Sequence, residues 1–219
     1  MNPVHVIGDS HVSLFAGADR FDGNGRAVWP DLLPDFRTHY LGAVLAYSIG
    51  KAGTKIRGRE KLFQVLKGIP EGACILLCCG AIDCETLHVR LPLYPGKTAA
   101  DVATVCADRY CSLIDEVVLL GYRTMVWAVM PTSGLPIPKP RFPLVGSVRD
   151  RNRLREVFNF AVEERCKNCP GLAFVSIWDH LVNADGSPRT EYYGDPAHLS
   201  QRALPFARAA VAHATERLM

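Results

Sequence analysis

Short apolar runs alternate with helical segments along the chain, and this alternation restricts the possible folds more than any other feature. The first four of these runs end at glycine or proline, which is typical of buried strands. Two neighbouring parallel strands must be joined by a crossover connection. Such a connection usually contains a helix and is almost always right-handed. The pattern predicts an α/β fold in which helices cover both faces of a mainly parallel, five-stranded sheet. The expected strands are Val4–Ile7, Phe36–Leu41, Ala73–Cys79, Thr124–Met130 and Leu172–Ile177.

Two capping boxes mark where the longest helices begin. Thr98-Ala-Ala-Asp101 is followed by apolar residues at helical spacing as far as Gly121, and Ser147-Val-Arg-Asp150 precedes a second such segment. No internal repeat divides the chain, so we expect a single domain over residues 1–219. Further helices are expected over 44–49, 57–66 and 199–218, and loops over 19–34 and 131–146.

The composition indicates an ordinary globular protein. Hydrophobic residues make up 48% of the 219 and charged residues 21%, so a core can form without disulfides or metal. The net charge of +3 is too small, and the basic residues are too scattered, for a nucleic-acid partner to be expected. Arg149, Arg151, Arg153 and Arg155 alternate along an expected helix, which should spread them over a solvated surface.

Location and cofactors are also predicted from what the chain contains. No apolar run approaches the roughly 20 residues of a bilayer span, and no basic leader precedes Val4, so neither a membrane nor secretion is expected. Most of the eight cysteines fall in apolar patterns, which suits free thiols in a reducing cytoplasm. Cys166 and Cys169 form a C-x-x-C without a matching second pair. We therefore expect a cytoplasmic protein with no metal and no cofactor.

The first apolar run stops at Gly8-Asp9-Ser10-His11, which we call the nucleophile turn. Open α/β sheets bind their ligands beyond the carboxyl ends of the strands, so Ser10 is a candidate nucleophile. A plainer interpretation is a strand-to-helix turn in which Asp9 or Ser10 caps the next helix. The turn by itself does not decide between the two.

A second candidate motif, Asp195-x-x-His198, lies near the other end of the chain. In a serine hydrolase, a histidine removes the hydroxyl proton and a carboxylate fixes the histidine tautomer. Ser10, His198 and Asp195 could fill these three roles. Taken alone, the motif also suits a helix cap beside a surface histidine.

Together, the Gly8-Asp9-Ser10 and Asp195-x-x-His198 blocks resemble those of the SGNH, or GDSL, hydrolase superfamily. The resemblance extends over nearly the whole chain and implies a flavodoxin-like αβα sandwich with a five-stranded sheet. It implies that Ser10 is the nucleophile, His198 the general base and acid, and Asp195 the orienting carboxylate. His11 after the serine indicates a less typical branch.

The resemblance also implies an oxyanion hole, and here the sequence departs from the family pattern. Donors would be the backbone N–H groups of Ser10 and Gly42, with an Asn side chain after the third strand. The corresponding block is Gly80-Ala81-Ile82-Asp83, and Ile82 cannot donate a hydrogen bond. Loss of one such donor costs about a hundred- to a thousandfold in rate.

Several polar residues near these blocks are candidate substrate contacts. Asp83 could hold its turn or bind substrate hydroxyls, and His88 could reach the same rim, although a solvated loop also accounts for His88. The predicted substrate contacts are Asp9, His11, Asp83 and His88.

We therefore expect an esterase or acyltransferase that acts through an acyl-Ser10 intermediate on a small-molecule or carbohydrate ester. One alternative is a metal-dependent phosphoesterase with Asp9 and His11 as ligands. Another is a catalytically degenerate binding domain, which Ile82 would suit. The sequence leaves the acceptor, the substrate and the oligomeric state open.

Overall fold

A computed structural model describes residues 2–17, 32–137 and 144–219 of the chain. Its central element is a parallel sheet with strand order β2-β1-β3-β4-β5. The predicted α/β architecture with a five-stranded parallel sheet is therefore confirmed. The strands are β1 (Val4–Gly8), β2 (Phe36–Tyr40), β3 (Cys74–Cys78), β4 (Arg123–Trp127) and β5 (Leu172–Val175).

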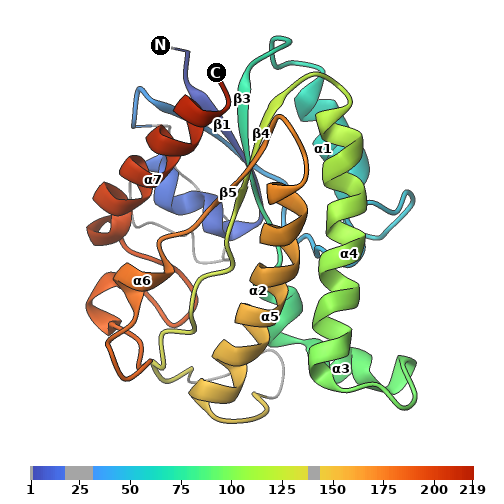
Figure 1. Ribbon diagram of the computed structural model, residues 1–219, viewed down its shortest axis with the longest axis vertical. Coiled ribbons are helices and arrows are strands. Elements are labelled where there is room, and N and C mark those ends of the chain that lie inside the picture. The colour runs from blue at the N-terminus through green and yellow to red at the C-terminus, as the bar shows by residue number, and fades with distance from the viewer. Residues whose placement is uncertain (1, 18–31, 138–143) are drawn as a thin grey trace.

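Helices cover both faces of the sheet (Figure 1). Successive strand residues point to opposite faces, so Ile75 and Leu77 enter one core whereas Leu76 enters the other. The first face is covered by α1 (Gly58–Leu66), α4 (Ala99–Val118) and α5 (Val148–Lys167). The second is covered by the 3-10 helix η1 (Ser10–Ala16) and α7 (Leu204–Arg217).

Local sequence signals determine where the two long helices begin. Thr98 caps α4 and Ser147 caps α5, and in each case the aspartate three residues later bonds back to complete the predicted capping box. Shorter helices connect the other elements: α2 (Ala81–Glu85), α3 (Leu87–Arg90), η2 (Leu91–Leu93), α6 (Trp178–Leu181), η3 (Thr190–Tyr192) and η4 (Gln201–Ala203).

Two predicted helices differ from the structure. Residues 46–50 form turns instead of a helix, because the backbone N–H groups of Ala46 and Tyr47 donate to the distant Asp83 carboxylate. The last helix begins at Leu204 rather than at 199, since Leu199 pairs with Tyr193 in an antiparallel bridge. Most of the predicted loop 19–34 and part of the loop 131–146 lie outside the described residues.

The helices and the cysteines can also be compared with the expectations from the sequence. None of the helices in the described ranges has both the length and the apolar character that a bilayer span requires. All eight cysteines are free, and seven of them are buried. The predicted free thiols are therefore confirmed.

Gly8, at the end of β1, packs closely against Cys78 of β3. A Cβ at this position would lie 1.9 Å from the carbonyl oxygen of Cys78, so the backbone would have to move. We expect Gly8→Ala to lower the free energy of unfolding by about 3 kcal/mol, measured by urea denaturation. Gly50→Ala is the matched control, because its Cβ would meet Leu113 at an ordinary 3.6 Å. Equal denaturation midpoints for the two variants would contradict this account of Gly8.

Candidate active site

Ser10 opens helix η1, and only Asp9 separates it from the end of β1 at Gly8. Asp9 is the N-cap of that helix: its carboxylate accepts from the backbone N–H of His11, at 3.0 Å. The Asp9 backbone N–H donates in turn to Cys78 on β3. The plainer interpretation of the turn as a cap is thus correct for Asp9, and it leaves the Ser10 hydroxyl available for another partner.

Asp195 and His198 lie on a closed loop from Tyr193 to Leu199, which we call the Asp-His loop. The bridge between Tyr193 and Leu199 closes it. Inside it, one carboxylate oxygen of Asp195 accepts from the backbone N–H groups of Ala197, at 2.7 Å, and His198, at 2.9 Å. These bonds fix the loop conformation and the carboxylate together.

Side-chain hydrogen bonds anchor the Asp-His loop to the segment that follows β4. The Tyr193 hydroxyl donates to the carbonyl oxygen of Pro131, at 2.6 Å. The Ser133 hydroxyl donates to the carbonyl oxygen of Pro196, at 2.7 Å. The loop is therefore held against the carboxyl edge of the sheet, beside the nucleophile turn.

The structure brings Ser10, His198 and Asp195 together in one chain of contacts. His198 Nε2 lies 2.7 Å from Ser10 Oγ, and His198 Nδ1 lies 2.8 Å from Asp195 Oδ2. Both separations are hydrogen-bond distances. In this arrangement Nε2 can accept the hydroxyl proton while the carboxylate holds the Nδ1–H and stabilises the imidazolium that forms.

The electrostatics of Asp195 suit that orienting role. Partial burial opposes ionisation, but the hydrogen bonds from His198 and from the Ala197 backbone outweigh it and lower the pKa of Asp195 below its usual 3.8. Asp195 is therefore a carboxylate at neutral pH, able to accept from the imidazole.

The two predicted backbone oxyanion donors, Ser10 and Gly42, lie at the same edge of the sheet. Gly8 pairs with Tyr40 in the parallel ladder, so Ser10 and Gly42 each lie two residues beyond the end of paired strands. Gly42 has φ +97°, a conformation that strongly favours glycine. Ile82, in α2, lines the same cavity as Ser10 and brings an apolar side chain to the place where the family pattern has an amide.

A cavity of about 260 Å³ opens beside Ser10 and His198. Much of its described wall is apolar, including Ile82, Ile137 and Leu144. Glu85 and Arg155 contribute an ion pair to the same wall. The cavity can therefore enclose a small uncharged group next to the Ser10 hydroxyl.

Arg155 corrects the prediction of a solvated arginine series. Arg149 and Arg153 are exposed, but Arg155 is buried, donates to the carbonyl oxygen of Met130 at 2.7 Å and pairs with Glu85. Alternate residues of a helix spread around its axis, so one of the series turns towards the sheet. The sequence holds no signal for the pairing, because Glu85 lies 70 residues away.

Of the predicted substrate contacts, Asp83 and Asp9 have no exposed surface and are not available to a substrate. Asp83 accepts from the backbone of Ala46 and Tyr47 and pairs with Arg90 at 3.2 Å, so it holds the turn at 46–47 instead.

The two histidines lie in different places. His11 lines the cavity, and both of its ring nitrogens have partners. His88 is on α3, outside the described lining of the cavity.

Asp9 and His11 are the two ligands that the metal-dependent alternative would use. Their side chains hydrogen-bond to each other at 2.8 Å. Within the described residues, no group of three or more His, Cys, Asp or Glu side chains is placed to hold a metal ion.

Comparisons with known proteins identify the fold. No family model and no curated protein matches the sequence. The chain is similar in structure to a carbohydrate acetylesterase, Est24 of Sinorhizobium meliloti, with TM-score 0.61, 16% identity and 100% of both chains covered. It is also similar to a GDSL-like lipase of Bacteroides thetaiotaomicron, with TM-score 0.63, 14% identity, and 100% of this chain and 89% of that one covered.

The OSK domain of Drosophila Oskar is a further structural neighbour, with TM-score 0.56, 15% identity, and 96% of this chain and 87% of that one covered. Unlike the other two, it is not named as an enzyme. The chain therefore has the fold expected from its resemblance to SGNH/GDSL hydrolases, and the fold alone does not assign an activity.

The raised pKa of the buried Asp83, which holds the turn at 46–47, can be tested by the pH dependence of stability. Burial raises the pKa of Asp83 from 3.8 to about 6, against the opposing charge of Arg90. The folded protein thus holds this proton more tightly than the unfolded chain, so Asp83 costs stability as the pH rises through this range.

Relative to Asp83→Asn, which cannot titrate, we expect the wild type to lose about 2 kcal/mol of unfolding free energy between about pH 4 and pH 6.5. Urea denaturation at the two pH values measures the difference. Any constant effect of the substitution cancels in the comparison. A difference between the two proteins that stays the same at both pH values would contradict the raised pKa.

Proposed function

We propose that the protein is an SGNH-type serine esterase that cleaves a small ester through an acyl-Ser10 intermediate. The observation that carries the proposal is the 2.7 Å contact between Ser10 Oγ and His198 Nε2, with Asp195 on the other ring nitrogen. The esterase and the lipase among the structural neighbours support a hydrolase.

In the first half-reaction, Ser10 Oγ attacks the ester carbonyl while His198 Nε2 takes the hydroxyl proton. The carbonyl oxygen becomes an oxyanion, which the backbone N–H groups of Ser10 and Gly42 would stabilise. The intermediate then collapses: the bond to the alcohol oxygen breaks, and the imidazolium gives its proton to the departing alcohol. The acyl group remains on Ser10.

In the second half-reaction, His198 takes a proton from the acceptor, whose oxygen attacks the acyl-Ser10 carbonyl. Collapse of this second intermediate returns the proton to Ser10 and releases the acyl group. Water as acceptor gives hydrolysis, and a sugar hydroxyl gives acyl transfer. Both reactions use the same three side chains, so the access of water to the cavity decides between them.

The cavity supports an uncharged ester as substrate. The apolar residues around Ile82 suit a short acyl group, and the charge of Arg155 is offset by Glu85. The structural likeness to a carbohydrate acetylesterase makes acetylated sugars the first substrates to test.

Fluorophosphonate labelling tests the nucleophile. We expect the reagent to modify Ser10 in the wild type, not to modify Ser10→Ala, and to react at least about a thousandfold more slowly with His198→Ala, because the imidazole activates the hydroxyl. Ser112→Ala is the control: Ser112 is exposed on α4 and donates to Asp108. Labelling that persists in Ser10→Ala would sink the assignment, and a folded wild type that neither labels nor cleaves p-nitrophenyl acetate would favour a binding domain.

Asp195→Asn tests the orienting carboxylate. The amide presents an N–H₂ or a weaker acceptor to His198 Nδ1, so the ring loses its preferred tautomer. We expect kcat for p-nitrophenyl acetate to fall by about a hundred- to ten-thousandfold, with KM little changed. Asp185→Asn, an exposed carboxylate that bonds only to Ser187 among the described residues, should leave kcat unchanged. Wild-type kcat in Asp195→Asn would rule out this role.

A further inference from the structure

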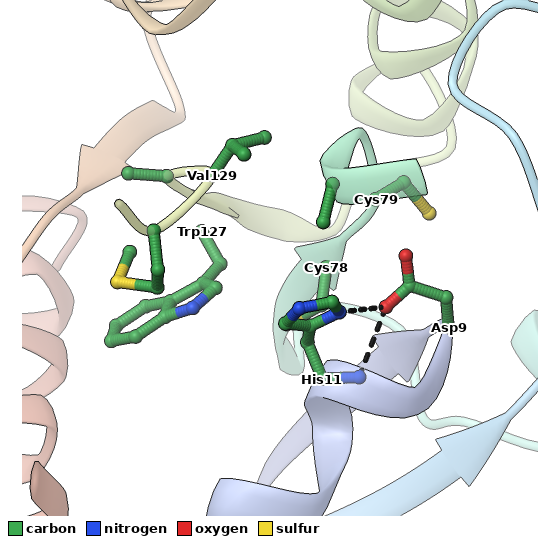
Figure 2. A pocket seen from close by; sticks show the side chains of 9 residues that line it. Asp9, His11, Cys78, Cys79, Trp127 and Val129 are labelled. Carbon is green, nitrogen blue, oxygen red and sulfur yellow. Dashed lines mark hydrogen bonds and ion pairs between the residues drawn. The ribbon is translucent and has the colours of Figure 1, made fainter. Parts of the chain in front are cut away.

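The two ring nitrogens of His11 each face a hydrogen-bond acceptor. Nδ1 lies 2.8 Å from Asp9 Oδ1, and Nε2 lies 3.2 Å from the carbonyl oxygen of Ala197 (Figure 2 shows the Asp9 contact). A neutral imidazole carries one N–H and can donate only once. Both contacts are therefore hydrogen bonds at the same time only when His11 is an imidazolium.

The charged groups around His11 favour that form on balance. Burial opposes it, and so does the guanidinium of Arg155 on α5, but the carboxylate of Asp9 and the Ala197 carbonyl outweigh them. The pKa of His11 is accordingly raised above its usual 6.5. Because the Asp9 side chain is only 1% exposed, the imidazolium is also its compensating charge.

Two thiols beside His11 are uncharged, and the other imidazole of the site lies close to it. Cys78, the last residue of β3, and Cys79 line the small space next to His11, and burial keeps their thiols neutral by raising their pKa values well above the usual 9.0. The His198 ring lies 5.1 Å away between centroids, tilted by 44°, and its carboxylate partner Asp195 is on the far ring nitrogen.

The Ala197 contact connects two separate parts of the site. Ala197 immediately precedes His198, and its own N–H donates to Asp195 at 2.7 Å. His11 immediately follows Ser10. The bond from His11 to Ala197 thus joins the residue after the proposed nucleophile to the residue before the proposed base, across 186 positions of sequence.

We propose that His11 is a positioning residue that acts as an imidazolium, tying the nucleophile turn to the Asp-His loop and so keeping His198 in register with Ser10. This inference rests on the proposed esterase function. When His11 loses a proton, one of its ring nitrogens becomes an acceptor that faces an acceptor oxygen. That hydrogen bond is lost, and the two segments are no longer joined through His11. Activity should therefore fall as the pH rises through the pKa of His11, to a lower plateau and not to zero.

The pH dependence of kcat with p-nitrophenyl acetate tests this role. We expect the wild type to drop by about tenfold across the alkaline step, the cost of roughly one charge-assisted hydrogen bond. His11→Gln should show the lower kcat at all pH values without that step, and with KM little changed. His213→Gln, an exposed histidine on α7, should behave like the wild type. A His11→Gln enzyme with wild-type kcat, or one that retains the alkaline step, would overturn the proposal.

Asp9→Asn gives a second variant should His11→Gln fail to fold. Asparagine caps helices as well as aspartate does, so η1 keeps its N-cap while the negative charge beside His11 is removed. The alkaline step should then move to lower pH. A step that stays at the wild-type pH would contradict the role given to the Asp9–His11 pair.

Ring-nitrogen NMR shifts of His11, followed from about pH 5 to pH 9, test the imidazolium without reference to catalysis. We expect a doubly protonated ring that titrates above 6.5, and at lower pH in Asp9→Asn. A ring that is neutral below pH 6.5 would overturn the proposal even in an active enzyme. A wild type that cleaves no ester, with His11 doubly protonated, would instead contradict the proposed function.

Discussion

The hydrogen bond between Ser10 and His198 joins residues 188 positions apart, and the candidate site depends on it. It can form because all five strands are parallel, so that the carboxyl ends of β1 and its neighbours meet at one edge of the sheet. The base does not lie on a strand, however. Two hydrogen bonds hold its loop at this edge. Tyr193 of the loop donates to Pro131 in the segment after β4, and Ser133 of that segment donates to Pro196 of the loop. Sheet topology brings the two halves near each other, and side-chain hydrogen bonds set the final distance.

Two buried carboxylates hold the segments that carry the proposed oxyanion donors. Asp9 caps the helix that begins at Ser10, and Asp83 binds the backbone at 46–47, shortly after Gly42. A buried carboxylate is costly unless hydrogen bonds and a cation offset it. Here His11 and Arg90 are those cations. The backbone at this edge lies beyond the paired strands, and hydrogen bonds to these two carboxylates hold it in place.

The features that could be predicted from the sequence are those with a local cause. The strands follow from apolar runs, and helices α4 and α5 from capping boxes complete within four residues. The residues of the proposed triad were candidates because each lies in a short motif. What could not be predicted depends on distant partners: the turn at 46–50 needs Asp83, and the burial of Arg155 needs Glu85. The contact between His11 and Ala197 is of the same kind, because it joins residues 186 positions apart.

If the protein is the proposed esterase, Ile82 gives the positioning of His198 added importance. A third oxyanion donor would contribute about a hundred- to a thousandfold in rate, and an isoleucine side chain contributes none of it. Arg155 lines the same cavity, but two of its nitrogens already serve Met130 and Glu85. In the proposed esterase, proton transfer between Ser10 and His198 would then supply a larger share of the rate enhancement, and that transfer falls steeply when the two residues are misplaced. The proposed hydrogen bond from the His11 imidazolium to Ala197 would keep the two residues at this distance.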